Sequence, residues 1–300
     1  PPAGCTTVSE DTICKDVPAG QSFAASDVLH DSLNLRCFDQ RRRFGFELLY
    51  PIERYRNALT NPKILNRAGM LVDNPLLAAR DGNGPRSASL ISVSLIIGAP
   101  WQDLATPSSL TASKLEYLDS AGLESAGRWP LLIGELSKNQ PPSDPFMIES
   151  IAPRSGMNPL TQAAIAPATS TNPTENSING HEQNVPGLDD LQYACTFPLA
   201  TPILCLPGEV CECAPDRTGD LALVRDANSP LCQPPSGPVG ATQYSGKGYP
   251  GSRELSFARS MGARAVAASI CPKTAPKDPS EVGYTAALNV LAARLATTLK

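Results

Sequence analysis

The sequence predicts an α/β protein with a doubly wound, mostly parallel sheet that a large insertion interrupts. Two apolar runs of similar build, Ser89–Gly98 and Arg264–Cys271, each follow a helical pattern. Neither run shows the polar alternation of a half-exposed strand, so both suit strands covered on two faces, as in a parallel sheet wrapped by helices. A long loop-rich stretch separates them, and we expect the two runs to be parallel neighbours in one sheet.

The N-terminal part is expected to be irregular before regular structure begins. Residues 1–36 are rich in Ser, Thr, Asp and Pro and show no sustained period, so they are interpreted as an arm. A helix of about three turns is expected next, because Pro51 suits a first helical turn and Asn61-Pro62 stops the pattern. Its apolar residues recur at helical spacing: Leu48, Ile52, Tyr55 and Leu59.

The first apolar run is expected to form a strand that ends at Gly98-Ala99-Pro100. A second helix is predicted over Leu110–Gly122, because Leu115 and Leu118 share one face and Gly122 suits a C-cap. Residues 37–140 are therefore interpreted as the first part of the α/β domain.

The character of the chain changes between residues 141 and 250, which hold 17 of the 30 prolines. No helical pattern persists there, so this stretch is interpreted as an insertion, and we expect it to provide the contact surface of the protein. Residues 251–300 are interpreted as the last helix, strand and helix of the domain. They comprise an apolar stripe in Ser252–Met261, the second apolar run, and a strong amphipathic pattern from Tyr284 to Lys300.

The cysteines indicate disulfides. Five of the nine fall in the insertion, which has too little apolar pattern for a core of its own, so at least three disulfides and an exported protein are expected. Cys211 and Cys213 are too close to bond each other readily, and Cys205 and Cys232 are their nearest candidates. Neither a zinc site nor covalently bound haem is predicted. The chain has only two histidines, and its cysteines show neither the two-residue gap of a zinc knuckle nor a Cys-x-x-Cys-His motif.

Several segments together resemble the second half of a von Willebrand factor A (VWA) domain, in particular that of uncharacterised exported bacterial proteins. The order of helix, strand, helix, strand and closing helix carries the likeness. The supporting segments are Arg43-Phe44-Gly45-Phe46, Tyr50–Leu59, Gly98-Ala99-Pro100-Trp101-Gln102-Asp103-Leu104, Asn179-Gly180-His181-Glu182, Asp190-Leu191-Gln192-Tyr193-Ala194-Cys195 and Ser269–Lys273.

This resemblance implies a divalent cation held by an Asp-x-Ser-x-Ser motif after the first strand, where hard oxygen ligands suit Mg or Ca. The chain has no such motif. Its nearest match, Asp278-Pro279-Ser280, lacks the final serine and is better explained as a helix cap. Either the first half of the fold precedes this sequence or the metal site has been lost. The Pro1-Pro2 start likewise indicates a processed or incomplete N-terminus.

The net charge and the hydropathy of the chain exclude some classes of binding partner. A net charge of −4 and a pI near 5.3 argue against nucleic acid, which requires a basic face. No apolar stretch approaches the roughly 20 residues of a transmembrane helix. Other protein chains are therefore the expected partners.

Three short segments are candidates for chemistry. His181 could act as the base of a secreted hydrolase, although no Gly-x-Ser-x-Gly elbow accompanies it. Glu182, Asp189 and Asp190 could form an oxygen-rich calcium site that braces the insertion. Gly246-Lys247-Gly248 lacks the remaining residues of a phosphate loop and is interpreted as a turn before the helix at Ser252.

The favoured hypothesis is a non-enzymatic interaction or structural module of a cell-surface or extracellular assembly, exported to the periplasm, the cell surface or the medium. Two alternatives stay open. One is a secreted hydrolase that uses His181, and the other is a calcium- or magnesium-dependent adhesin whose metal site lies upstream of this chain.

Overall fold

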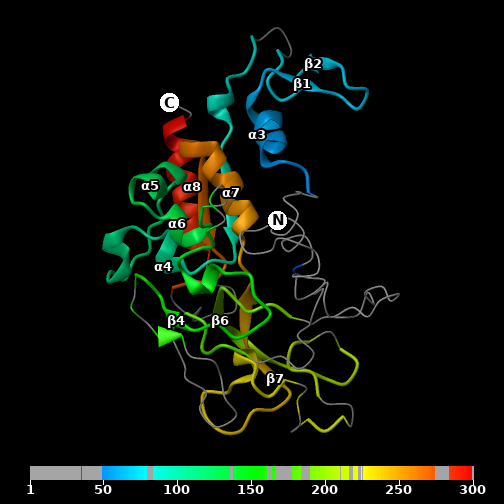
Figure 1. Cartoon of the computed structure of the whole chain (residues 1–300), viewed down its shortest axis with the longest axis vertical. Coiled ribbons are helices and arrows are strands. Elements are labelled where there is room, and N and C mark those ends of the chain that lie inside the picture. The colour runs from blue at the N-terminus through cyan, green and yellow to red at the C-terminus, as the bar shows by residue number, and fades with distance from the viewer. Residues whose placement is uncertain are drawn as a thin grey trace, which may run out of the picture.

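The computed structural model is elongated, with an α/β unit in the middle and the insertion at one end (Figure 1). It describes residues 35, 49–79, 84–135, 138, 140–160, 162, 164–165, 178–183, 190–209, 211–215, 219–221, 224, 226–273 and 284–298. The predicted arm 1–36, apart from Leu35, lies outside these ranges, as do Cys5, Cys14 and Cys37.

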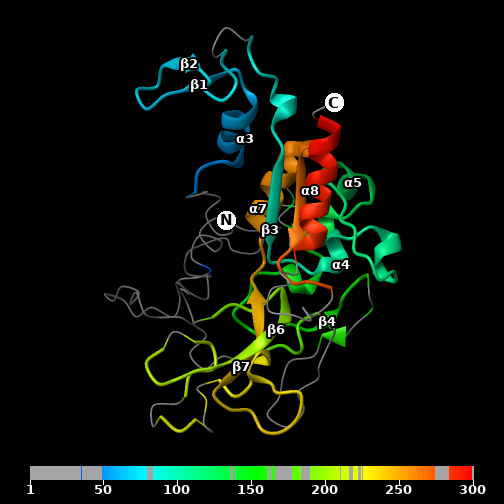
Figure 2. The same ribbon diagram turned by 180° about the vertical axis from the view of Figure 1, so that it is seen from behind.

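The two apolar runs form one parallel pair, as predicted. Strand β3 (Val93–Ile97) lies beside β8 (Ala265–Ser269), with Val93 opposite Ala265 and Ile97 opposite Ser269. Both strands are shorter than the runs that contain them. A 3-10 turn over Ala88–Leu90, capped by Ser87, precedes β3, and a second one over Gly262–Arg264 precedes β8. Figure 2 shows this pair flanked by α7 (Ser252–Met261) and α8 (Thr285–Thr298).

The helices on either side of β8 match the sequence pattern. Helix α7 buries Leu255, Ala258 and Met261, and it ends at Gly262, whose φ of 57° suits glycine. All five residues of β8 are buried, as expected for a strand covered on both faces. This is a mixed α/β fold with a small parallel sheet.

The N-terminal helix also forms where predicted. Helix α3 (Ile52–Thr60) packs on α7, and an antiparallel hairpin of β1 (Lys63–Leu65) and β2 (Leu71–Asp73) follows it. The hairpin projects from the α/β unit in Figure 1. Two short helices, α4 (Trp101–Leu104) and α6 (Trp129–Leu132), cover the unit further along the chain.

The helix predicted over Leu110–Gly122 is wrong. A 3-10 turn covers Pro107–Leu110, a turn and bends follow over residues 111–114, and the chain then runs extended until α5 (Ser120–Ser125). Asp119 ends the extended stretch, and its carboxylate accepts a hydrogen bond from the Gly122 amide at 2.7 Å as the N-cap of α5. The extended backbone pairs with residues 104–106 and with β8, and these tertiary hydrogen bonds replace those of a helix.

The insertion is built on a long antiparallel hairpin. Strand β6 (Cys195–Leu204) pairs with β7 (Thr242–Gly248), with an irregular register between Pro198 and Ile203. The turn predicted at Gly246-Lys247-Gly248 is therefore wrong, because these residues continue β7. Two further strands, β4 (Gly156–Met157) and β5 (Ala164–Ile165), form a minimal pair nearby.

Three disulfides connect described cysteines, as the composition predicted. They join Cys205 to Cys211, Cys213 to Cys232, and Cys195 to Cys271. The first two lie within the insertion, and they pair Cys211 and Cys213 with Cys205 and Cys232, the partners expected from the sequence. The third ties the start of β6 to the segment after β8, so it fastens the insertion to the α/β unit. The four domain boundaries drawn from composition stay a prediction.

Candidate functional site

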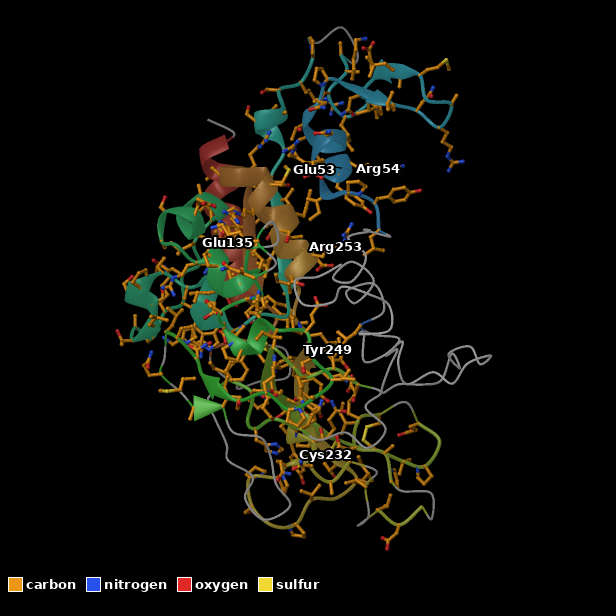
Figure 3. The ribbon with its side chains drawn as sticks, in the orientation of Figure 1. Glu53, Arg54, Glu135, Cys232, Tyr249 and Arg253 are labelled. Carbon is orange, nitrogen blue, oxygen red and sulfur yellow. A yellow bond between two sulfur atoms is a disulfide. The ribbon has the colours of Figure 1, made fainter. Side chains whose placement is uncertain are left out.

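The densest cluster of reactive side chains lies where the insertion meets the α/β unit. Lys247 is near the end of β7, and Tyr249 follows two residues later, so strand alternation directs both side chains to one side. Asp190 and Tyr193 come from the segment just before β6, and Glu212 comes from the disulfide-bonded loop. Figure 3 shows Tyr249 between the α/β unit and the β6–β7 hairpin.

The Asp190 carboxylate is surrounded by donors. Its Oδ1 accepts hydrogen bonds from the Tyr249 hydroxyl and, at 2.9 Å, from the Leu191 amide. Its Oδ2 accepts one from the Tyr193 hydroxyl at 3.3 Å and lies 3.2 Å from Lys247 Nζ. Both oxygens therefore face N–H or O–H groups.

Lys247 lies against two aromatic rings that contact each other edge to face. Its Nζ lies 5.0 Å from the ring centroid of Tyr193 and 4.7 Å from that of Tyr249, within the range of cation–π attraction. Glu212 Oε2 lies 2.9 Å from the same nitrogen. Only 17% of the Lys247 side chain is exposed, which limits solvent screening of this amine between two carboxylates.

Both tyrosine hydroxyls stay protonated in this setting. Burial, followed by the negative charge of Asp190, raises the pKa of Tyr193. Burial also raises the pKa of Tyr249, and the hydrogen bond to Asp190 raises it further. The two hydroxyls therefore act as donors to the carboxylate at any physiological pH.

A second polar cluster holds the turn around Glu182. Arg154 donates from Nε and Nη2 to the two oxygens of Glu182 at 3.0 and 3.1 Å, and Asn179 donates to Oε1 at 2.7 Å. The remaining guanidinium hydrogens reach backbone carbonyls of Pro145, Phe146, Ile148 and Tyr193. This buried, fully bonded pair organises the backbone around it and leaves no vacant ligand position on Glu182.

His181 is enclosed rather than presented to solvent. Its side chain is buried, and Nδ1 lies 2.9 Å from the carbonyl oxygen of Glu182. Within the described ranges, Nε2 has no hydrogen-bond partner, so no serine or cysteine nucleophile is bonded to it. Among the described residues, His181 therefore has no contact with a nucleophile of the kind a hydrolase uses.

Two of the three predicted calcium ligands, Glu182 and Asp190, lie in the described structure, and each is paired with a cationic side chain. Glu182 is engaged by Arg154, Asp190 faces Lys247 and two tyrosines, and Asp189 lies outside the described residues. In the part of the chain that is described, no three His, Cys, Asp or Glu side chains form a group that could hold a metal.

A buried pair of carboxyl groups lies under α4. Asp103 and Asp144 are both fully buried, and Asp144 accepts from the Asn158 amide at 2.8 Å and from the Phe146 backbone amide at 2.9 Å. Burial, with the nearby negative charge of Asp144, raises the pKa of Asp103 well above its usual range. Burial likewise raises the pKa of Asp144. Two such groups share a proton readily, but neither is open to a substrate.

A small pocket of about 230 Å³ opens at the carboxyl ends of β3 and β8. Ligands of open α/β sheets bind at this edge. Here Trp101, Thr196 and the Cys195–Cys271 disulfide line it, and Lys273 lies across the Trp101 ring at 4.9 Å. Lys273 donates to backbone carbonyls such as Ser109 at 2.5 Å, so its charge is already bound.

Sequence reasoning missed Lys247, Tyr193, Tyr249 and Arg154. One signal was available, because Lys247 and Tyr249 alternate at strand spacing, but the glycines around Lys247 favoured a turn. The contacts of Lys247 and Tyr249 with Asp190 span 57 and 59 positions and depend on the hairpin, which no local pattern predicts.

Comparisons with protein-family models, with curated proteins and with solved structures found no match to this chain.

None of the helices in the described ranges has the length and hydropathy to cross a bilayer. The three disulfides are consistent with a secreted protein, because such bonds persist in oxidising compartments.

Proposed function

We propose that this chain is a non-enzymatic interaction module of an exported assembly, and that an extended segment of a partner protein adds to its sheet along β3. The observation that carries this proposal is the open edge of β3. Among the described residues, β8 is the only strand that pairs with β3, whereas the other edge of β8 is bridged at Val266 by Asp119.

The edge of β3 lacks the usual protection. Natural sheets shield an edge strand with charged residues, proline or a bulge, and Val93-Ser94-Leu95-Ile96-Ile97 has none of these. Side chains on one face of β3 are exposed, including Ile96 at 40%. Figure 2 shows the strand with no helix or strand drawn in front of it.

The chemistry of a strand edge selects its occupant. Unpaired backbone N–H and C=O groups are satisfied in register only by another extended backbone, and parallel pairs of two strands are rarely left uncovered. We therefore assign a partner strand with small or apolar side chains at alternate positions.

A photo-crosslinking residue tests this surface in the cells that make the protein. Placed at Ser94, it is expected to link to one extended segment of one partner, identified by mass spectrometry. The matched position is Ile203 of β6, which is 52% exposed on the insertion and reports the alternative that the insertion carries the contacts. Linking at Ile203 but not at Ser94 overturns the assignment to β3.

Ser94→Lys provides the complementary loss of function. Ser94 is exposed, so a lysine there is expected to change the free energy of unfolding by no more than about 0.5 kcal/mol. It places a charge on the pairing edge, and we expect the assembled fraction to fall. Normal assembly with Ser94→Lys contradicts the proposal.

A further inference from the structure

We propose that Lys247 and Asp190 become joined by an intramolecular isopeptide bond, an amide between the lysine Nζ and the aspartate Cγ. This inference does not depend on the proposed function. It rests on a lysine amine, a carboxyl group and a second carboxylate that meet beside two tyrosine rings.

The reacting groups are already in contact. Lys247 Nζ lies 3.2 Å from Asp190 Oδ2, which is bonded directly to the carbon that would be attacked. The rings of Tyr193 and Tyr249, which contact each other edge to face, both lie within 5.0 Å of the amine and help to keep it there. Such positioning removes much of the entropic cost of bringing the amine and the carboxyl carbon together.

Glu212 supplies the proton relay. Its Oε2 lies 2.9 Å from Nζ and can accept a proton from the ammonium group, which frees the lone pair that attacks Cγ. Nζ begins with three protons and ends with one. The other two pass through Glu212 to an oxygen of Asp190, which leaves as water, so the step needs neither an oxidant nor a reductant.

The tyrosines and a backbone amide stabilise the intermediate. Attack on Cγ places negative charge on the oxygen that stays, and Oδ1 already accepts from the Tyr249 hydroxyl and the Leu191 amide. The Tyr193 hydroxyl contacts Oδ2, the oxygen that leaves. Donors in place before the reaction lower its barrier without reorganisation.

Lys273 is a natural comparison within the same chain. It also lies against an aromatic ring, that of Trp101, but its Nζ donates to the carbonyl oxygens of Ser109 and Leu110. Those groups belong to peptide amides, which do not acylate an amine readily. Lys273 should therefore stay unmodified.

The mass of the intact, reduced full-length chain tests the proposal directly. We expect a mass lower than the sequence mass by one water molecule, and a cross-linked peptide that contains both residues after proteolysis. Lys247→Arg and Asp190→Ala are expected to have their full sequence masses, whereas Lys273→Arg keeps the deficit. A wild-type chain of full sequence mass, or a deficit that survives Lys247→Arg, overturns the proposal.

The leaving group gives a sharper test that does not depend on a disruptive variant. Asp190→Asn presents an amide in place of the acid, so its condensation with Lys247 releases ammonia, and the deficit should change from one water to one ammonia. Glu212 is 38% exposed, so Glu212→Gln should fold, and we expect its unmodified fraction to rise. An Asp190→Asn chain that still lacks one water locates the modification elsewhere and overturns the assignment.

Discussion

Asp103 shows how a single residue acquires a property that its neighbours in sequence do not reveal. It lies in α4 between Gln102 and Leu104, fully buried, with Asp144 and Arg128 as charged neighbours. In the described structure its two carboxylate oxygens have no hydrogen-bond donor, which favours a protonated acid. Asp144 is also buried, and so the two groups do not ionise together without a penalty.

This pair predicts a stability that declines with rising pH. Because burial raises the pKa of Asp103, the folded chain binds more protons than the unfolded chain above about pH 4, the ordinary carboxyl value. Stability therefore falls as pH rises from there to the raised pKa, by about 1.4 kcal/mol for each pH unit in that interval. Asp103→Asn removes the titrating group and should flatten this decline, as measured by urea unfolding at a series of pH values.

The control for that measurement is Asp73→Asn. Asp73 lies in an exposed ion pair with Lys63 on the β1–β2 hairpin, and such pairs contribute little to stability. Its pH profile should parallel that of the wild type. A profile for Asp103→Asn that also runs parallel to the wild type would show that the buried pair does not titrate in this range.

At the scale of elements, sustained apolar patterns predicted secondary structure correctly, whereas the spacing of a single pair of leucines did not. Helices α3, α7 and α8 and the strands β3 and β8 lie where their patterns placed them, because a sustained apolar pattern favours one secondary structure. Their burial differs: β8 is buried throughout, as expected, whereas α3 and β3 contain no buried residue and β3 is not covered on both faces. The Leu115 and Leu118 pair fits a helix equally well, yet this segment became extended. Its backbone found partners in Leu104 and Thr106, which lie outside any local window.

The end of β3 predicts a strict requirement for glycine. A Cβ at Gly98 would lie 1.7 Å from the carbonyl oxygen of Tyr249, a backbone atom that cannot rotate away. Gly98→Ala is therefore expected to lower the free energy of unfolding by roughly 3 kcal/mol, the upper end for overpacking, as measured by denaturant titration.

Gly84→Ala is the matched substitution, because a Cβ there meets no atom within 4 Å and its backbone is not in the left-handed region. It should be neutral or slightly stabilising, since alanine restricts the unfolded chain. Equal effects of the two substitutions would show that β3 and the segment after β7 do not approach as closely as described.

For the whole molecule, the disulfides predict how strongly the insertion is fastened. Cys195 and Cys271 are 76 residues apart, whereas Cys205 and Cys211 are separated by 6. On loop-closure entropy, replacing the first pair with serine should cost about 4 kcal/mol and the second pair about 2 kcal/mol. Both are best measured by thermal unfolding in a Lys247→Arg background, since a cross-link at that residue would restrain much of the same chain. A larger loss from the shorter loop would contradict this order.

The sequence by itself determined the α/β class, the parallel pairing of two distant strands and the presence of disulfides in the insertion. These features follow from composition and periodicity. A continuous apolar run has to be buried, and a cysteine-rich segment without a core of its own needs disulfides to stabilise it. Only the tertiary structure decided that Lys247, Asp190 and Glu212 meet, that Glu182 pairs with Arg154, and that no second strand of the described ranges pairs with β3. Each of these depends on the β6–β7 hairpin or on the packing of the sheet, and contacts across such distances are set by the whole fold rather than by any local pattern.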